Sequence, residues 1–152
     1  MPDPVGATTR ACEPELIASA TEEMLRYASP VWFFRRTATH AVEIRGQRIE
    51  AGDKVVVWFA AANRDPDHYP EPHRFDVTRN PTDQLTFGRG GPHHCLGVHL
   101  ARLEVRVYLE ELVRRVARVE LAGPPVREDP WHVMLRASGR IPVGRISPGP
   151  VL

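Results

Sequence analysis

The segment that decides the fold is residues 87–97, which reads Phe87-Gly88-Arg89-Gly90-Gly91-Pro92-His93-His94-Cys95-Leu96-Gly97. Its glycines crowd a loop that leads directly into a long helical pattern, and glycine lets a backbone turn sharply and approach a flat surface closely. Cys95 stands where that helix is expected to begin. Free N–H groups and the positive end of a helix dipole favour the thiolate form of a cysteine there. The loop therefore predicts a charged sulfur that is available to a metal.

The helical pattern after the loop runs from Leu96 to Val119 and is the longest in the chain. Apolar residues recur along it at helical spacing, which predicts an amphipathic helix. Glutamate–arginine pairs four residues apart, such as Glu110 and Arg114, are expected to support it. Further on, short apolar pieces between Trp131 and Ile146 predict strands of a terminal sheet. The apolar line of the helix consists of Leu96, Leu100, Leu103 and Val107, widened by Leu109, Leu112, Val113 and Val116.

Upstream of the loop the sequence predicts a helix, a small antiparallel sheet and an irregular stretch, in that order. Apolar positions at helical spacing predict the helix over Pro14–Tyr27, and Ser29-Pro30 ends it. A glycine turn between alternating segments predicts a hairpin over Val42–Ile49, and the apolar run Val55–Phe59 predicts a strand covered on both faces. From Asn63 to Thr86 the apolar residues follow neither helical nor strand spacing. An irregular stretch of that length is usually functional or held by neighbouring segments.

Composition excludes several classes of protein. A chain of 152 residues is long enough for one core and too short for two ordinary domains. The formal net charge of +1 provides no field for binding nucleic acid or an anionic membrane. The longest apolar run, Val55–Ala62, is far shorter than the roughly 20 residues that span a bilayer. The two cysteines, Cys12 and Cys95, form no disulfide framework and fit a reducing compartment. We therefore expect a cytoplasmic protein that binds neither nucleic acid nor a membrane.

Taken alone, the loop leaves three interpretations of Cys95 open. The first is a thiolate ligand of a haem iron. The second is an inert buried cysteine that opens an amphipathic helix, which is the commoner fate of a lone cysteine. The third is a zinc site built from Cys95 with His93, His94 and His99, because Cys95 and His99 lie four residues apart and thus on one face of a helix.

The loop resembles the cysteine-ligand signature of the cytochrome P-450 family. That signature has a phenylalanine, two residues, a glycine, a basic residue two positions before the cysteine, and then Cys-x-Gly. The matching positions here are Phe87, Gly90, His93, Cys95 and Gly97. One residue more than in the commonest spacing separates Phe87 from Cys95. A Gly-Gly-Pro-His loop of this length resembles a subset of bacterial, actinobacterial members, including sterol-oxidising ones.

The resemblance implies a site for haem b (iron protoporphyrin IX). Cys95 would be the axial ligand of the iron, and its sulfur would push electron density onto the metal. Phe87 would supply an apolar face beside the macrocycle. Gly90 and Gly97 match the glycine positions of the family's loop and would let the backbone approach the cofactor.

Two basic residues would contact the haem propionates. His93, two residues before the cysteine, is the first. The second is Arg36, with Arg35 as the alternative, in a segment where the family lines its substrate pocket. Val133–Leu135 falls where a terminal turn of the family touches substrate.

Two further motifs occur in the order that the family shows. Glu23 and Arg26 stand three residues apart on one helix face, and Pro72-His73-Arg74-Phe75 follows later. In the family such segments join in a buried Glu–Arg–Arg network that locks the meander, the irregular stretch before the cysteine loop. One carboxylate that accepts from two planar guanidinium groups is a geometrically fixed arrangement. Glu23, Arg26 and Arg74 would therefore be structural.

The resemblance also implies the fold class and the extent of the chain. The expected class is α+β, mainly α: a Glu-x-x-Arg helix, a small β-sheet, a meander, a cysteine-ligand loop, a long helix and a terminal β-hairpin. Residues 1–152 would form the C-terminal part of a single catalytic domain. The N-terminal region and the oxygen-activating helix would be absent, so no catalytic acid or alcohol is expected within the chain.

The implied function is that of a haem-thiolate monooxygenase, an oxidoreductase that inserts one atom of dioxygen into an organic substrate. By itself the truncated chain would be weakly active or inactive. Electrons would come from a ferredoxin or a flavin reductase, and the substrate would be small and apolar. Two interpretations of Arg102, Arg106 and Arg114 stay open: a docking face for an acidic partner, or a solvated face of the helix. The alternative function is that of a small zinc- or partner-binding module that uses Cys95 and the neighbouring histidines.

Overall fold

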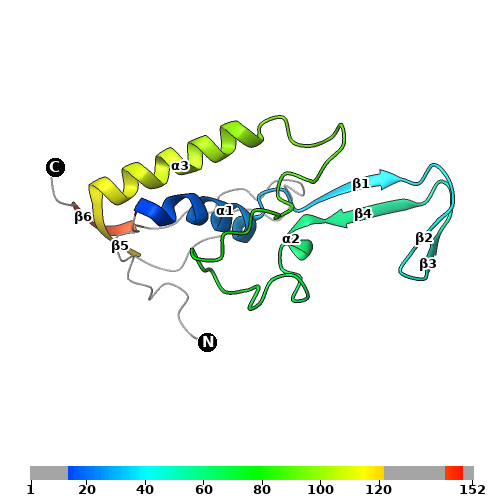
Figure 1. Cartoon of the computed structure of the whole chain (residues 1–152), viewed down its shortest axis with the longest axis horizontal. Coiled ribbons are helices and arrows are strands. Elements are labelled where there is room, and N and C mark those ends of the chain that lie inside the picture. The colour runs from blue at the N-terminus through cyan, green and yellow to red at the C-terminus, as the bar shows by residue number, and fades with distance from the viewer. Residues whose placement is uncertain (1–13, 122–142, 149–152) are drawn as a thin grey trace.

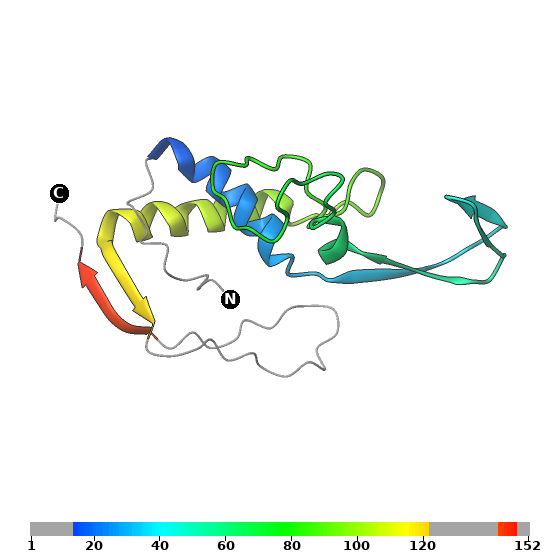
Figure 2. The ribbon, with the colours of Figure 1, turned by 90° about the horizontal axis from the view of Figure 1, so that it is seen from below.

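The computed structural model describes residues 14–121 and 143–148. Two helices lie side by side and a long two-stranded arm extends away from them (Figures 1 and 2). Short antiparallel strand pairs complete the fold. In chain order the elements are η1 (Pro14–Leu16), α1 (Ile17–Ala28), β1 (Phe33–Thr37), β2 (Val42–Ile44), β3 (Gln47–Ile49), β4 (Lys54–Trp58), α2 (Phe59–Ala62), α3 (Val98–Arg115), β5 (Val116–Leu121) and β6 (Val143–Pro148).

The predicted first helix is confirmed as α1, with its first turn formed by the 3-10 helix η1. The apolar side of α1 is buried and packs against α3, where Ile17 and Ala20 meet Leu109. The helix ends at Ser29, which adopts a left-handed conformation (φ 40°) and precedes a proline. The Ser29 hydroxyl donates to the Arg26 carbonyl at 2.7 Å and so satisfies part of the helix end.

The arm consists of β1 paired antiparallel with β4, and the β2–β3 hairpin lies at its far end (Figure 1). The predicted hairpin over Val42–Ile49 is therefore confirmed. The strand predicted over Val55–Phe59 is also present, as β4, but the expectation that both of its faces are covered is wrong. Val56, Val57 and Trp58 are 39–50% exposed, so the faces of this two-stranded sheet are not covered by the described residues. A continuous apolar run predicts a strand but not the layers that cover it.

The long helix α3 ends at Arg115, four residues before the predicted end, because Val116 starts strand β5. The predicted apolar line lies outside the core. Leu96 is 99% exposed, and Leu100, Leu103 and Val107 are 46–60% exposed. Helical periodicity identifies an apolar face but cannot identify the partner that covers it. We call these four residues the α3 stripe, of which Leu96 lies just before the helix and the other three lie on it.

The chain after α3 forms an antiparallel pair of β5 with β6 that contains register shifts. This pair corresponds to the predicted terminal β-hairpin, although its first strand occupies positions that were expected to be helical. The segment around Trp131 and Val133–Leu135 lies outside the described residues. Within the described part of the chain, no helix is long and apolar enough to cross a bilayer.

Candidate functional site

The cysteine loop is held by its own backbone. The Cys95 N–H donates to the Phe87 carbonyl at 3.1 Å, which closes the loop across its base. Gly88, Gly90 and Gly91 have φ values of 72°, 65° and 73°, the left-handed region that side chains strongly disfavour. The loop thus requires glycine at these positions, and the density of glycine in the sequence was the signal for it.

The side chain of Cys95 is exposed to solvent at the end of the loop. Cys95 is a free and exposed cysteine, so the interpretation of an inert buried cysteine is wrong. A Cβ atom built on Gly88, Gly90 or Gly91 would meet no atom within 4 Å, and one built on Gly97 would lie 3.9 Å from Sγ. An exposed sulfur beside open, side-chain-free backbone fits a broad flat ligand such as a haem. Among the described residues no hydrogen bond reaches Sγ, so backbone donors do not cradle the sulfur here.

The zinc interpretation requires the neighbouring histidines to converge on the sulfur. His93, His94 and His99 are exposed, as is Cys95. Over residues 14–121 and 143–148, no group of three or more His, Cys, Asp or Glu side chains is placed to hold a metal ion. The described residues therefore offer no ligand cluster for zinc.

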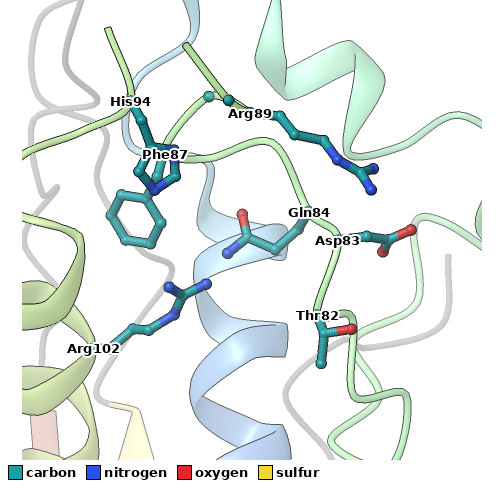
Figure 3. Close-up of a pocket in the computed structure, with 9 residues that line it drawn as sticks. Thr82, Asp83, Gln84, Phe87, Arg89, His94 and Arg102 are labelled. Carbon is teal, nitrogen blue, oxygen red and sulfur yellow. The ribbon is translucent and has the colours of Figure 1, made fainter. Parts of the chain in front are cut away.

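Phe87 is half-buried, and one face of its ring is covered by the guanidinium of Arg102, 5.3 Å from the ring centroid. Arg102 in turn makes two hydrogen bonds to Glu22 of α1, at 2.6 and 3.1 Å. Gln84 donates to the same carboxylate at 3.3 Å. These contacts fix the ring of Phe87 at the edge of a pocket of about 270 Å³ (Figure 3). The pocket is lined by Thr82, Asp83, Gln84, Phe87, Gly88, Arg89, Gly90, His94 and Arg102.

The two residues expected at the haem propionates lie on different elements. His93 is exposed in the loop, and Arg36 is exposed on β1. The Arg36 guanidinium lies 5.5 Å from the Phe34 ring centroid and donates to the Arg35 carbonyl at 3.0 Å. Their predicted contacts with propionates stay predictions.

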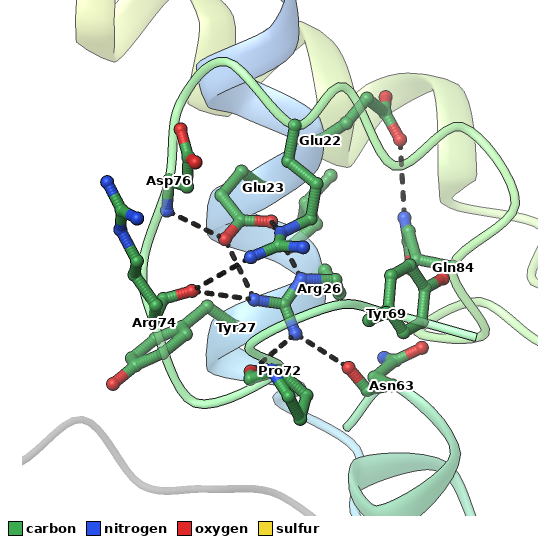
Figure 4. Close-up of polar contacts among 12 residues, drawn as sticks. Glu22, Glu23, Arg26, Tyr27, Asn63, Tyr69, Pro72, Arg74, Asp76 and Gln84 are labelled. Carbon is green, nitrogen blue, oxygen red and sulfur yellow. Dashed lines mark hydrogen bonds and ion pairs between the residues drawn. The ribbon is translucent and has the colours of Figure 1, made fainter. Parts of the chain in front are cut away.

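Two of the three residues of the expected structural network form a buried ion pair. Arg26 Nε and Nη2 donate to the two carboxylate oxygens of Glu23 at 2.7 and 2.8 Å, and both side chains are fully buried. Arg26 Nη1 also donates to the carbonyls of Asn63 and Pro72, at 2.7 and 3.0 Å (Figure 4). A single guanidinium on α1 therefore fixes the irregular segment at two points 9 residues apart.

The third member of the network is Arg79, so the prediction of Arg74 was wrong. The carbonyl of Arg74 faces inward and accepts from Arg26 at 3.3 Å, which leaves its side chain directed outward. That side chain is 62% exposed and pairs with exposed Glu71 at 3.1 Å. The Arg79 side chain is only 13% exposed, and its Nε lies 3.6 Å from Glu23 Oε2.

Sequence reasoning missed Arg79 because nothing local to that residue marks it as buried. The Glu23 carboxylate also accepts from the backbone N–H of Asp76 at 3.0 Å. Arg79 itself donates to the carbonyls of Pro70 and Glu71, at 2.7 and 3.3 Å. The only available signal was an arginine a few residues beyond the expected one, at the end of the same polar turn.

A second polar cluster lies where the meander meets the pocket. Tyr69 is buried and donates to Asp83 at 3.2 Å, while His68 Nε2 contacts the other oxygen of that carboxylate at 2.5 Å. Burial, followed by the nearby Asp83 charge, raises the pKa of Tyr69 to about 12. Partial burial acts to raise the pKa of Asp83, but the hydrogen bond and the charge of His68 outweigh it together with smaller contributions, so this pKa is lowered.

Comparison with known proteins places the geometry in a family. The model of the family "Cytochrome P450" matches residues 15–140. The chain is 47% identical over 112 residues to the methyl-branched lipid omega-hydroxylase of Mycobacterium tuberculosis and 50% identical over 110 residues to the linalool 8-monooxygenase of Pseudomonas putida. These matches cover 74% and 72% of this chain. The chain belongs to the cytochrome P-450 family.

Solved structures agree with this assignment. The cytochrome P-450 OxyD, which is involved in the biosynthesis of vancomycin-type antibiotics, superposes with a TM-score of 0.79 at 37% identity over 88% of this chain. The expected fold class, a portion of this family's fold with small antiparallel sheets, is thereby confirmed. The chain spans 26% and 27% of the lengths of the two curated relatives and 33% of the OxyD chain.

Proposed function

We propose that this chain is the haem-binding part of a haem-thiolate monooxygenase, with the Cys95 sulfur as the axial ligand of the iron in haem b. The observation that carries the proposal is the exposed sulfur beside side-chain-free backbone at the start of α3. When bound, a thiolate-ligated haem supplies the redox chemistry by which one atom of dioxygen enters an organic substrate and the other leaves as water.

The residues around Cys95 would hold and orient the cofactor. Glycine at position 97 keeps a side chain away from the Cys95 sulfur, because a Cβ there would lie 3.9 Å from Sγ, and Gly90 adds open backbone in the same loop. The guanidinium of Arg102 lies over the ring of Phe87 and helps to hold it in place. His93 and Arg36 carry the basic groups that would bind the haem propionates. Charge-assisted hydrogen bonds from such groups are strong and directional, so they would set the orientation of the haem in its plane.

We further propose that residues 1–152 act as the C-terminal part of one catalytic domain. The chain spans about a quarter of the length of its curated relatives. The exposed α3 stripe is the kind of apolar surface that a larger fold would cover. Oxygen activation needs a site that excludes water, which these residues do not enclose by themselves, so the chain alone would have little or no monooxygenase activity.

The substrate would be a small apolar molecule, in keeping with relatives named for a methyl-branched lipid and for linalool. The electron donor would be a ferredoxin or a flavin reductase, and the protein would work in the cytoplasm. Ion pairs within the chain lessen the support for the docking face that was expected at three arginines of α3. Arg102 pairs with Glu22 and Arg106 with Glu110, while Arg114 shares the single carboxylate of Glu111 with Arg115, so much of this charge is already paired within the chain.

The test is reconstitution of the purified chain with haemin, followed by reduction and a carbon monoxide difference spectrum. The proposal predicts the thiolate-ligated band for the wild-type chain and its loss in Cys95→Ser. The matched control His99→Ala removes a possible imidazole ligand on α3 and should retain the band. A spectrum of histidine-ligated haem that Cys95→Ser leaves unchanged would refute the ligand. Stoichiometric zinc in the purified chain, without haem uptake, would favour the metal-binding module.

A further inference from the structure

We infer that Asn63 is the positioning residue of the cysteine loop, the side chain that connects the end of α1 to the segment preceding Phe87. Asn63 follows the short helix α2 and is completely buried. No motif considered so far assigns a role to its side chain. Its amide is the centre of a polar cluster drawn from segments that lie far apart in the sequence.

Every polar atom of the Asn63 side chain has a partner. Nδ2 donates to the hydroxyl oxygens of Ser29 and Thr86, each at 3.0 Å. Oδ1 accepts from the backbone N–H of Leu85 at 2.6 Å. The Asn63 carbonyl accepts from Arg26, as described above. Asn63 therefore joins α1, the meander and the residues that lead into the loop.

The geometry of the two hydroxyl groups requires an amide at position 63. The Ser29 hydroxyl gives its proton to the Arg26 carbonyl at 2.7 Å, and the Thr86 hydroxyl gives its proton to the Leu25 carbonyl at 2.8 Å. Each oxygen thus turns only lone pairs toward Asn63 and needs a donor. An amide supplies two donors and one acceptor. A carboxylate of the same shape supplies none of the donors, so three acceptors would face one another in a buried space.

Backbone hydrogen bonds connect the polar cluster of Asn63 to the residue that carries the sulfur, Cys95. Leu85 and Thr86, which bind Asn63 directly, precede Phe87, and the Phe87 carbonyl accepts the Cys95 N–H at 3.1 Å. The Leu85 carbonyl also accepts the Gly88 N–H at 2.9 Å. Displacement of Leu85 and Thr86 would therefore move both the base of the loop and the backbone that carries Sγ. The inference rests on the proposed function only insofar as the positioned sulfur is a haem ligand.

The test compares Asn63→Asp with Asn80→Asp in the purified chain without haem. Both variants replace an amide by a carboxylate, but Asn80 is exposed and lies in a turn with φ 47°. We expect amide hydrogen exchange at Leu85 and Cys95 to accelerate at least tenfold in Asn63→Asp and less than twofold in Asn80→Asp. Thr86→Val, which removes one acceptor of Asn63 and keeps the shape, should accelerate the same amides by a smaller factor. Thr86→Val also provides the test if Asn63→Asp does not fold.

A purely structural role predicts a different pattern. General destabilisation would accelerate the α3 amides around Leu109 as much as those of Leu85 and Cys95, and the core variant Ile17→Val calibrates that response. Wild-type protection at Leu85 and Cys95, or an equal loss throughout α3, would overturn the inference. Because exchange is measured without haem, the result can be interpreted whether or not the wild-type chain shows thiolate ligation. Where it does, Asn63→Asp should lower the thiolate-ligated fraction and Asn80→Asp should not.

Discussion

Replacement of Arg79 by methionine should destabilise the chain much more than replacement of Arg74 by methionine. The Arg79 side chain is 13% exposed, lies 3.6 Å from the fully buried Glu23 carboxylate and donates to two meander carbonyls. The Arg74 side chain is 62% exposed and pairs with a glutamate that is 71% exposed. The two substitutions are chemically identical and lie five residues apart, so each controls for the other.

The magnitudes follow from burial. Removal of one partner from a fully buried ion pair costs about 3–5 kcal/mol, but Glu23 keeps both hydrogen bonds from Arg26. We therefore expect about 1.5–3 kcal/mol for Arg79→Met, the range for lost hydrogen bonds to charged groups. An exposed ion pair contributes about 0–1 kcal/mol, which sets the expectation for Arg74→Met.

The assay is equilibrium unfolding in urea, followed by far-ultraviolet circular dichroism, with the free energy of unfolding extrapolated to water. Arg26→Met provides the upper reference, because it removes the bidentate partner of Glu23. Equal losses for Arg79→Met and Arg74→Met, or a larger loss for Arg74→Met, would refute the assignment of the third residue of the network.

Three further predictions concern the loop and the meander. Gly88→Ala should lower the free energy of unfolding by about 1–2 kcal/mol, because φ is 72° there, and unfolding midpoints equal to wild type would contradict this. Hydrogen bonds from Thr78 lower the pKa of Asp76, so this carboxylate stabilises the fold above its unfolded pKa and the contribution disappears as pH falls through the folded pKa. Thr78→Val should therefore destabilise the chain at pH 7 and lose its effect in strong acid; an effect independent of pH would exclude this linkage. Tyr69, with its pKa raised to about 12, should ionise above the ordinary pH range of a tyrosine in an ultraviolet titration, and Asp83→Asn should move its transition to lower pH.

The cysteine loop could be predicted from the sequence because its constraints are local. Left-handed backbone at three nearby positions demands glycine, and Cys95 lies between these glycines and the start of a helix. The Glu23–Arg26 pair could be predicted for the same reason, since its members stand at positions i and i+3 of one helix.

The contacts that sequence reasoning could not supply depend on tertiary geometry. The Pro-x-Arg-Phe motif favoured Arg74 over Arg79, but in the structure the Arg74 carbonyl faces Arg26 while the Arg79 guanidinium lies beside Glu23. Asn63 reads as an ordinary turn residue, because asparagine is common in turns. Its burial arises from partners 22 to 34 residues away. The outward position of the α3 stripe likewise depends on which side of α3 faces α1.

Iron K-edge X-ray absorption of the haem-loaded chain tests the central claim most directly. The account predicts one sulfur scatterer in the first coordination shell of the iron, at bonding distance, which disappears in Cys95→Ser. A first shell of nitrogen and oxygen alone in the wild-type chain would contradict ligation of the iron by Cys95.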